Sequence, residues 1–399
     1  MSMELTKCKL GEVVTLLNGR AYLMPELQDS GKYRILRVGN LSGGNDSWYY
    51  SDMELDDNKY CESGDLLYAW ACNFGPHIWK EEKVIFHYHI WKLVVDKKKI
   101  NKFFLYYYLL HQTPFYLGGV NGATMVHITK KNMEKKTIYI PCSLETQHHI
   151  ASILSTYDSL IENNTKRIRI LEKMAENLYK EWFVRFRFPG HEKVEMENGL
   201  SKGWSIIKIK ELSNVKSGFA FKSEWFTDAG CRVAKIKDIG GVLMDTSDLS
   251  YVSEDNCKKA EKFILREGDL TIALTGATIG KISIVPKHRG LIYTNQRLGK
   301  FFNGDNPIEN LPFLYCLFVQ DIMVQDIMNL SNSSSAQPNI SPEQIGNIKF
   351  KGNMDLIKRY NEVAKGFFQE ILSLHEMNQN LARQRDLLLP RLMSGKLEV

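Results

Sequence analysis

The stretch IASILSTYDSLIENNTKRIRILEKMAENL (150–178) decides the fold, because apolar residues recur along it in steps of four and three. A second stretch, YNEVAKGFFQEILSLHEMNQNLARQRDLL (360–388), has the same spacing, and each of its positions lies 210 residues after its match. Heptad spacing of this kind gives a helix one apolar stripe that needs a partner. The sequence therefore predicts two long helices that pack on each other.

The two predicted helices are each about 50–60 Å long at 1.5 Å per residue, which is longer than a compact domain needs. A globular region separates them in the sequence, so no short loop joins them. This favours an antiparallel coiled-coil spacer with one globular region at each end over a helical hairpin inside a single core. The predicted seam residues are Ile150, Leu154, Tyr157, Ile161, Asn164, Ile168, Leu171, Leu178, Tyr360, Phe367, Ile371, Leu374, Asn378, Leu381 and Leu388.

Polar residues interrupt this apolar seam. A buried asparagine lowers the stability of a coiled coil but can specify its register. Asn164 and Asn378 either have this role or lie where the seam faces solvent. Arg385, also on the seam, predicts that the pairing loosens there.

The globular regions repeat as well. NGRAY (18–22) matches SGFAF (217–221), and SGDLLYA (63–69) matches EGDLTIA (267–273). The other matches are YRILRVGNL (33–41) with CRVAKIKDI (231–239), and GATMVHIT (122–129) with SAQPNIS (335–341). The offset drifts from 198 to beyond 210, so loops differ in length between the copies. One scaffold that presents two different surfaces would have this pattern.

The predicted order of the chain is a first globular domain over residues 1–143, a helix over 144–190, a linker over 191–203, a second globular domain over 204–353 and a helix over 354–399. In the first domain, strands are predicted over 33–38, 65–70, 83–95 and 136–141, and a short helix over 103–112. Proline cannot donate a backbone hydrogen bond, so Pro390 should break or kink the last helix.

The composition is that of a folded protein, with 44% hydrophobic and 25% charged residues. The net charge of +6 permits a polyanionic partner without requiring one. The seven cysteines form no C-x-x-C pair, which argues against a zinc site or a disulfide framework. We find no signal-peptide pattern and no apolar run of membrane-spanning length, so we expect a soluble cytoplasmic protein.

Motifs for catalysis are weak. GATIGKIS (276–283) falls one spacer residue short of a phosphate-binding loop and has Ile282 where Ser or Thr is needed, so a β-turn with Lys281 facing DNA or solvent is the better interpretation. Four histidines lack metal-ligand partners at useful spacing: His127, His148, His149 and His288. We therefore expect no catalytic residue, metal or cofactor in this chain.

Polar loops that mix amide, basic and aromatic side chains are the candidates for contact with a polyanionic partner such as DNA. Asn and Gln can pair with adenine edges, and Arg and Lys with guanine edges or phosphates. The candidates in the first domain are Arg37, Asn40, Asn73, His77, Lys80, Asn121, His127, Lys130 and Lys131. Those in the second domain are Lys235, Lys237, Thr275, Thr278, Lys281, Asn295, Gln296, Arg297, Gln337 and Asn339. Each could instead be a solvated loop residue.

Two aromatic groups have alternative interpretations. Trp70 and Trp79 flank a loop, where core packing is favoured over base stacking. Trp182, Phe183 and Phe186 crowd the end of the first long helix, where they either pack on the adjacent domain or form a docking surface for a partner.

The helix ends resemble a known family. LEKMAENLYKEWFVRFRFPG (171–190) and QHHIASILSTYDSLIENNTKRIRILEKMA (147–175) resemble the central region, and RQRDLLLPRLMSGKLEV (383–399) the C-terminal region, of specificity subunits of type I restriction–modification enzymes. The SGDLLYA and EGDLTIA pair resembles the middle of the target-recognition domains of that family. The resemblance covers essentially the whole chain.

The resemblance implies an α+β protein with two similar α/β target-recognition domains, two antiparallel coiled-coil helices and a pseudo-two-fold internal repeat. It implies sequence-specific binding of a bipartite, asymmetric duplex DNA target, with two modification subunits docked on the helices and restriction/translocase subunits added to them. S-adenosylmethionine, ATP and Mg²⁺ would then bind those partner subunits. The alternatives are a coiled-coil interaction scaffold without DNA specificity, or a self-sufficient DNA-modifying enzyme.

Overall fold

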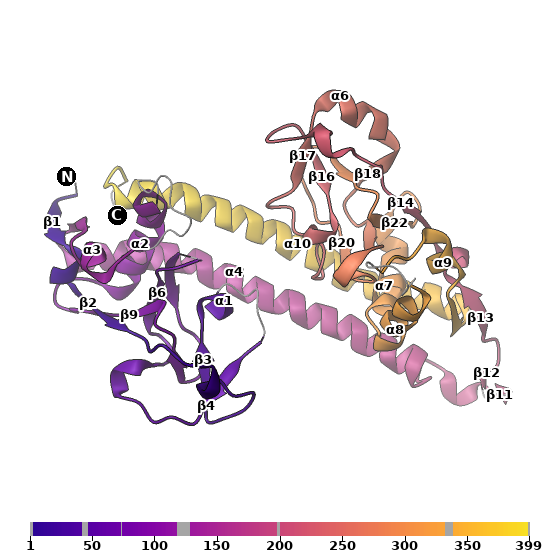
Figure 1. The fold of residues 1–399 in the computed structure, drawn as a ribbon. Helices are drawn as coiled ribbons and strands as arrows, with labels where there is room; N and C mark the ends of the chain where they lie inside the picture. Colours follow the sequence, from indigo (N-terminus) through magenta and orange to yellow (C-terminus); the bar gives the residue numbers. More distant parts are fainter. Residues whose placement is uncertain are drawn as a thin grey trace. The chain divides into compact units, whose positions relative to one another are not determined.

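The computed structural model describes residues 3–41, 47–72, 74–117, 128–197, 200–331 and 338–397. The chain divides into two compact units, unit 1 with Met1–Ile161 and Leu381–Val399 and unit 2 with Glu162–Asn380. The two long helices, α4 (Leu144–Tyr179) and α10 (Met354–Met393), contribute one section to each unit (Figure 1). Each unit is therefore a sheet-rich domain packed on a section of both helices.

Unit 1 contains three small sheets. A four-stranded sheet has the order β2-β9-β6-β7, and a second has the order β4-β3-β8-β5. A third sheet pairs β1 with β10. The strands are β1 (Leu5–Lys9), β2 (Val14–Asn18), β3 (Tyr33–Leu36), β4 (Tyr49–Ser51), β5 (Tyr60–Cys61), β6 (Leu66–Ala69), β7 (Gly75–Ile78), β8 (Val84–Phe86), β9 (Ile90–Val95) and β10 (Thr137–Pro141).

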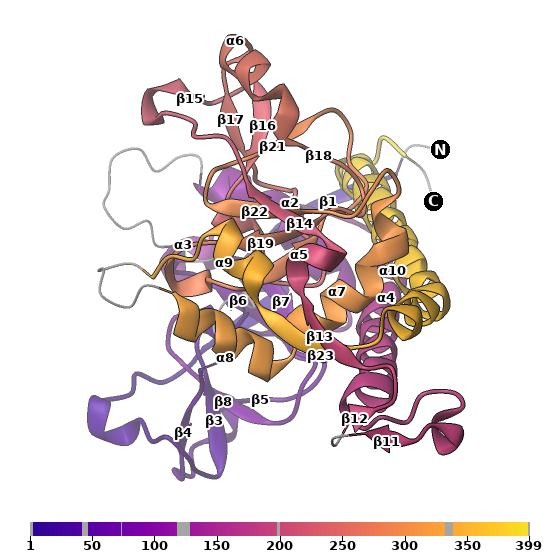
Figure 2. The same cartoon turned by 90° about the vertical axis from the view of Figure 1, so that its right-hand side faces the viewer.

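Unit 2 repeats these three sheets in the same order. Its first sheet is β14-β22-β19-β20, its second is β15-β17-β16-β21-β18 with one added edge strand, and β13 pairs with β23 (Figure 2). The strands are β13 (Ser205–Lys208), β14 (Asn214–Ser217), β15 (Phe226–Thr227), β16 (Cys231–Ala234), β17 (Ser250–Val252), β18 (Ile264–Leu265), β19 (Leu270–Ala273), β20 (Ile282–Ile284), β21 (Ile292–Thr294), β22 (Leu298–Phe302) and β23 (Lys349–Gly352). Even the single parallel pair recurs, as β3 with β8 and as β16 with β21. The predicted internal repeat is confirmed as a repeat of topology.

The strand registers fix which residues correspond. Gly19 and Gly218 occupy the same position, and at each of them an added Cβ would collide with the backbone carbonyls at the end of β8 or β21. Both positions therefore need glycine, because two backbones cross there without room for a side chain. This match explains why NGRAY and SGFAF share their second residue.

Matching turns mark where each globular domain begins and ends. The backbone N–H of Lys9 donates to Glu12 Oε2 at 3.1 Å, and that of Lys208 donates to Glu211 Oε1 at 2.8 Å. Later in each copy a hydroxyl caps a short helix: Thr129 caps α3 (Lys130–Glu134), and Ser341 caps α9 (Pro342–Asn347). The same local chemistry thus brackets both domains.

One predicted strand is wrong. The run KVIFHYHIWKLVV (83–95) forms two strands, β8 and β9, which belong to different sheets. His87, Tyr88 and His89 make the turn between them, and Ile90 N donates to His87 O at 3.0 Å. Apolar and aromatic residues continue through the turn, and aromatic residues are common in strands. The sequence pattern therefore does not indicate where one strand ends and the next begins.

The core of each unit forms where a helix covers the sheets. In unit 1 this helix is α2 (Lys102–Leu117), which includes the predicted helix 103–112; in unit 2 it is α7 (Pro307–Phe318). Each places one tyrosine against α4. Tyr107 Oη donates to Asp158 Oδ2 at 2.5 Å, and Tyr315 Oη donates to Glu172 Oε1 at 2.6 Å. In each copy the covering helix, α2 or α7, is thus joined to α4 by apolar contacts and one charge-assisted hydrogen bond.

Contacts within each unit show that α4 and α10 run antiparallel. In unit 2 Arg167 pairs with Glu370 at 2.7 Å, and Asn164 Nδ2 donates to Asn378 Oδ1 at 2.9 Å. In unit 1 Arg385 pairs with Asp158 at 2.5 Å. Partner numbers fall along α10 as they rise along α4, so the predicted antiparallel pairing is confirmed. Arg385 keeps the helices bridged where its charge had predicted looser packing.

The ends of the long helices differ from the prediction. A π-helical turn (Lys180–Val184) follows α4, and Phe186 then takes a positive φ of 59°. The last helix continues through Pro390 to Met393. Proline removes only one N–H donor, and the helix ends within a turn of it, so little hydrogen bonding is lost.

The remaining α-helices and strands of the described residues are short. They are α1 (Val38–Leu41), α5 (Ile209–Leu212), α6 (Glu254–Cys257), α8 (Asp321–Leu330), β11 (Met196–Glu197) and β12 (Leu200–Ser201). The last two form a small hairpin inside the predicted linker. No single helix among the described residues is long and apolar enough to span a bilayer; α7 and α8, bent by 79°, meet that test only as a pair.

Candidate nucleic-acid interface

Three polar segments of unit 2 meet beyond the end of β19. Leu274 N donates to Arg297 O at 2.9 Å, and Ile340 N donates to Leu274 O at 3.0 Å. Thr275 also forms an isolated bridge with Asn339. Candidate residues far apart in the sequence, Thr275, Arg297 and Asn339, are therefore brought together at one edge of the sheet.

The exposed candidates at this edge are Lys281, Gln296, Arg297 and Asn339. No described residue forms an ion pair with the Lys281 ammonium or the Arg297 guanidinium. Asn295 is different, because it is 7% exposed and its Oδ1 accepts a hydrogen bond from Arg297 N at 3.1 Å. It holds the turn that presents its two neighbours, so its carbonyl is unavailable to a base in this structure.

Other candidates in unit 2 are paired or buried inside the domain. Lys237 pairs with Asp248 at 2.8 Å. The Lys235 ammonium lies 3.5 Å from the centre of the Phe226 ring, and burial lowers the pKa of Lys235. The Thr278 hydroxyl is buried without a hydrogen-bond partner. The segment GATIGKIS forms a turn that leads into the strand β20, whose first residues are Ile282 and Ser283, instead of into the helix that a phosphate-binding loop requires.

The candidates in unit 1 are more dispersed. Arg37 and Asn40 hold a loop, since both side chains donate to Ser47 O, and the Arg37 guanidinium also lies 4.3 Å from the centre of the Tyr49 ring. His77 is half-buried in β7, where burial lowers its pKa. Lys80 and Lys131 are exposed, and Lys130 pairs with Glu134 at 3.7 Å. Asn73, Asn121, His127 and Gln337 lie outside the described residues.

The unit 1 counterpart of the Asn295–Arg297 turn is not among the residues predicted from the sequence. A parallel bridge joins Arg20 to His87 in unit 1 and Phe219 to Asn295 in unit 2. His87, Tyr88 and His89 therefore match Asn295, Gln296 and Arg297, at an offset of 208. The offset of 208 lies between the 204 of the SGDLLYA and EGDLTIA pair and the 210 of the helices, so the drifting offset brackets this match without locating it.

Both imidazoles of this turn have lowered pKa values. Burial is the main cause for His87, and His89 and Arg37 add to it, so that the pKa of His87 falls to about 4. Burial also lowers the pKa of His89. Both side chains are neutral at pH 7 and can accept as well as donate hydrogen bonds.

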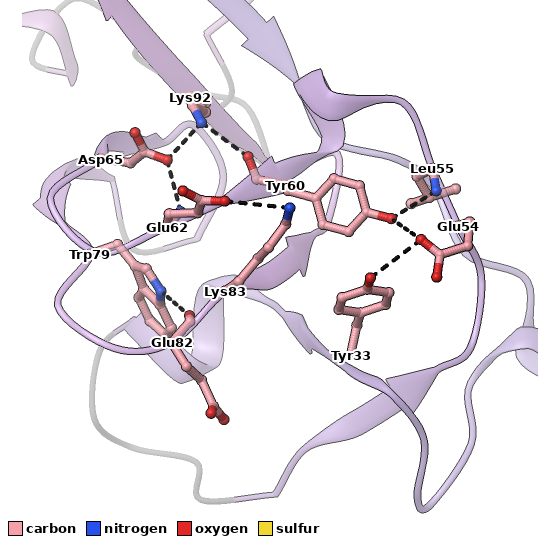
Figure 3. A network of polar contacts seen from close by, with 10 residues as sticks. All are labelled: Tyr33, Glu54, Leu55, Tyr60, Glu62, Asp65, Trp79, Glu82, Lys83 and Lys92. Atoms are coloured by element: carbon pink, nitrogen blue, oxygen red, sulfur yellow. Dashed lines mark hydrogen bonds and ion pairs between the residues drawn. The ribbon is translucent and has the colours of Figure 1, made fainter.

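The two tryptophans differ in burial. Trp79 is 6% exposed, and its Nε1 donates to Glu82 O at 2.8 Å, which is the core packing favoured from the sequence (Figure 3). Trp70 is half-exposed, and its Nε1 donates to Tyr88 O at 2.8 Å. Trp70 thus belongs to the same turn as Tyr88.

The Gly-Asp motifs have a structural role. Asp65 pairs with Lys92 at 2.6 Å, and Lys92 also donates to Tyr60 O at 3.1 Å (Figure 3). In unit 2, Asp269 pairs with Lys300 at 2.5 Å, and Lys300 donates to Ile264 O at 3.1 Å. Each aspartate also accepts a backbone N–H three residues before it. In each domain the motif therefore links two sheets through a lysine: the sheets of β9 and β5 in unit 1, and the sheets of β22 and β18 in unit 2.

The seam candidates of the helices are all buried or half-buried. The most buried are Ile150, Leu154, Asn164, Tyr360, Ile371 and Leu374. The half-buried ones are Tyr157, Ile161, Ile168, Leu171, Leu178, Phe367, Asn378, Leu381 and Leu388. Phe368, next to Phe367, is fully buried against Tyr315, so at this point the buried face of α10 turns toward the domain.

The predicted docking residues lie mainly inside unit 2. Trp182 and Phe183 are 6% and 8% exposed and contact Tyr360. Phe186 is half-buried against Trp204, with ring centres 4.8 Å apart. Local packing therefore accounts for Trp182 and Phe183, and neither side chain is available to a partner in this structure.

Candidate metal ligands are not clustered: within the described ranges, no three His, Cys, Asp or Glu side chains are placed to share an ion. The exposed polar candidates of unit 2 gather instead at one edge of a sheet, and unit 1 has a matching turn at His87–His89. Two copies of one scaffold with different exposed side chains define a protein with two recognition surfaces.

Comparisons with known proteins identify the class of target. A family model described as the type I restriction modification DNA specificity domain matches residues 3–173 and again 201–351. The MjaVIII specificity subunit of Methanocaldococcus jannaschii is 25% identical, over 98% of this chain and 92% of that protein. The HindI specificity subunit of Haemophilus influenzae is 21% identical, over 87% and 89%. Both relatives are subunits of type I restriction enzymes.

A solved structure has the same fold. The crystal structure of the type I restriction–modification S subunit from M. genitalium superposes with a TM-score of 0.58 at 19% identity, covering 98% of this chain and 96% of that one. This chain belongs to the family of type I restriction–modification DNA specificity subunits. Its role is sequence-specific DNA recognition, without a catalytic activity of its own.

Proposed function

We propose that the chain recognises a bipartite, asymmetric duplex DNA sequence, with one half-site for each recognition domain. The observation that carries this proposal is the contrast at one matched turn. The backbones of the two turns correspond, but Tyr88 and His89 stand in one copy where Gln296 and Arg297 stand in the other. Identical scaffolds with different exposed side chains suit two different half-sites.

The base chemistry proposed for unit 2 follows from its exposed side chains. Gln296 can pair bidentately with an adenine edge, and Arg297 with a guanine edge. Lys281, on the neighbouring turn, is suited to a phosphate, because a lysine ammonium acts as a point charge.

The coiled coil would measure the distance between half-sites and support two modification subunits, to which restriction/translocase subunits would add. The exposed outer residues of the helices, such as Ile170 and Met174 on α4, support docking there better than the buried Trp182 and Phe183 do. S-adenosylmethionine, ATP and Mg²⁺ would bind these partner subunits, and the modification subunits would methylate adenine. This chain would bind no cofactor itself. The complex would act in the cytoplasm. This part of the proposal rests on the family resemblance.

The test is selection from a random duplex library by the chain purified with its modification subunit. We expect a split motif and binding that weakens steeply as salt rises. Exchanging residues 204–350 for those of another family member should change one half of the motif only. A scaffold without DNA specificity would enrich no motif.

A finer test separates base contacts from phosphate contacts. Arg297→Ala should relax one base position, costing about 1–3 kcal/mol of discrimination, whereas Lys281→Ala should weaken binding to all sequences. Arg289→Ala is the matched control, because Arg289 is an exposed arginine that precedes β21 while Arg297 follows it. Loss of the motif in the control variant would count against this assignment.

A further inference from the structure

Unit 1 contains a small hollow with aromatic walls beside the Tyr88 turn. Its volume is about 330 Å³, and its lining includes Trp70, Tyr88, Trp91, Gly19, Ile128 and Lys130. The Trp70 and Trp91 rings stack with centres 5.8 Å apart and an interplanar angle of 22°. The Tyr88 side chain is 38% exposed at the edge of the hollow. A flat, largely apolar surface is thus held open at the candidate interface.

The second copy has the same framework without these walls. The strand registers match Trp70 to Leu274, Tyr88 to Gln296 and Trp91 to Gly299. The supporting positions keep their chemistry: Gly19 matches Gly218, and Ile128 matches Ile340.

The sheet does not require Trp70 and Tyr88, because the second copy forms the same sheet with Leu274 and Gln296 at their positions. Trp91 is different, because it is 2% exposed and packs in the core of unit 1 behind the hollow that it lines. Exposed aromatic surface is also unfavourable in water. The partly exposed rings of Trp70 and Tyr88 therefore suit a function of the first domain that the second lacks.

The hollow is held in place by main-chain contacts. Trp70 N donates to His89 O at 3.1 Å, and Gly19 N donates to Ile90 O at 3.4 Å. The neutral His87 and His89 place no charge beside the rings at pH 7. Lys130 also lines the hollow, and its ammonium pairs with Glu134 at 3.7 Å. An uncharged, flat group next to a phosphate fits this arrangement.

We propose that this hollow is a base-binding site of the first domain, which accepts the apolar surface of one nucleobase in its half-site. That surface is either the 5-methyl group of a thymine or the face of an unstacked base, since both give van der Waals contact with aromatic walls. The inference rests on the proposed function and adds a mode of recognition that differs between the two domains.

The test uses Tyr88→Gln and Trp70→Leu, which introduce residues of the kind that the second copy carries at the same positions. Tyr88 is partly exposed, so Tyr88→Gln should fold normally, as circular dichroism would check. We expect each variant to lower affinity for the selected duplex by about fivefold or more. In a selection from the random duplex library, each variant should no longer specify one base position, and this position should lie in the first half of the motif. Tyr139→Ala is the control, because Tyr139 is a 48% exposed tyrosine on β10 of the same unit.

Two modified duplexes separate the sources of the apolar surface. A thymine-to-uracil change in the first half-site should weaken binding if the 5-methyl group is the contact. 2-Aminopurine should brighten on binding if a base is unstacked. If the wild type enriches a split motif but both variants leave it and the affinity unchanged, this inference is wrong while the proposed function stands. If the wild type enriches no motif, the proposed function itself fails.

Discussion

Asn164 and Asn378 meet across the two antiparallel helices, with Asn164 Nδ2 donating to Asn378 Oδ1 at 2.9 Å. Asn378 Nδ2 also donates to Thr165 Oγ1 at 3.3 Å. Asn164 is 5% exposed, so its amide depends on this partner. Two seam asparagines that the sequence left ambiguous thus specify one register, since a slip of either helix would leave a buried amide unpaired.

The Asn164–Asn378 pair gives the first prediction. Asn164→Leu should lower the free energy of unfolding by about 1 kcal/mol or more, because Asn378 Oδ1 loses the hydrogen bond that Asn164 Nδ2 donates. The double variant Asn164→Leu/Asn378→Leu should recover stability, since an apolar pair can replace a polar pair at little cost. Urea titration of the four proteins in a double-mutant cycle measures the coupling; additive effects would contradict a direct interaction.

The backbone crossings at Gly19 and Gly218 give the second prediction. Gly19→Ala and Gly218→Ala should each destabilise the protein by ~1–3 kcal/mol, because the new methyl group would overlap carbonyl oxygens. Gly366→Ala is the control, since Gly366 lies in α10 with no atom within 4 Å of an added Cβ. That change should stabilise the helix by ~0.5–1 kcal/mol. Thermal unfolding midpoints compare the three variants.

The matched lysines of the Gly-Asp motifs give the third prediction. Lys300→Met should cost ~3 kcal/mol, because it leaves the Asp269 side chain, 3% exposed, without its cation. Burial already raises the pKa of Asp269 and outweighs the opposing effect of Lys300. Lys92→Met should cost less, since Asp65 is 28% exposed and can be hydrated. Equal losses in urea titrations of the two variants would show that burial does not set the difference.

Protonation of His87 gives the fourth prediction. Its folded pKa of about 4 lies below the usual 6.5, so protons bind the unfolded chain more readily. Stability should therefore fall as the pH drops from 6.5 toward 4. His77, His89 and His375, whose pKa values are also lowered, add to this fall. His87→Asn, which introduces the residue type of the matched Asn295, should make the melting temperature less dependent on pH between 7 and 5. An unchanged slope would exclude His87 as a contributor.

The sequence predicted the helices and the repeat because both depend on spacing, which is local information. Heptad positions such as Ile150 and Tyr360 repeat regardless of what covers them. The turn at His87–His89 could not be located in the same way, because two strands of different sheets join there without a glycine or proline.

The exposure of the candidate DNA-binding residues could not be predicted from the sequence, for a different reason. Asn295 and Arg297 look equally suitable in the sequence, yet one is buried under the turn that the other extends from. Trp182 and Phe183 likewise look like a docking surface until the second domain is placed over them. Composition indicates the chemistry of a side chain, but only tertiary packing decides whether it reaches a partner.

The turns at Glu12 and Glu211 and the caps at Thr129 and Ser341 also have a consequence for inheritance. Because the chain enters and leaves both domains through the same local bonds, the coding segment between an entry turn and an exit cap is a cassette with compatible ends. Genetic recombination at these joints would give a cell a new DNA target in one event, while the helices that its other proteins depend on stay unaltered.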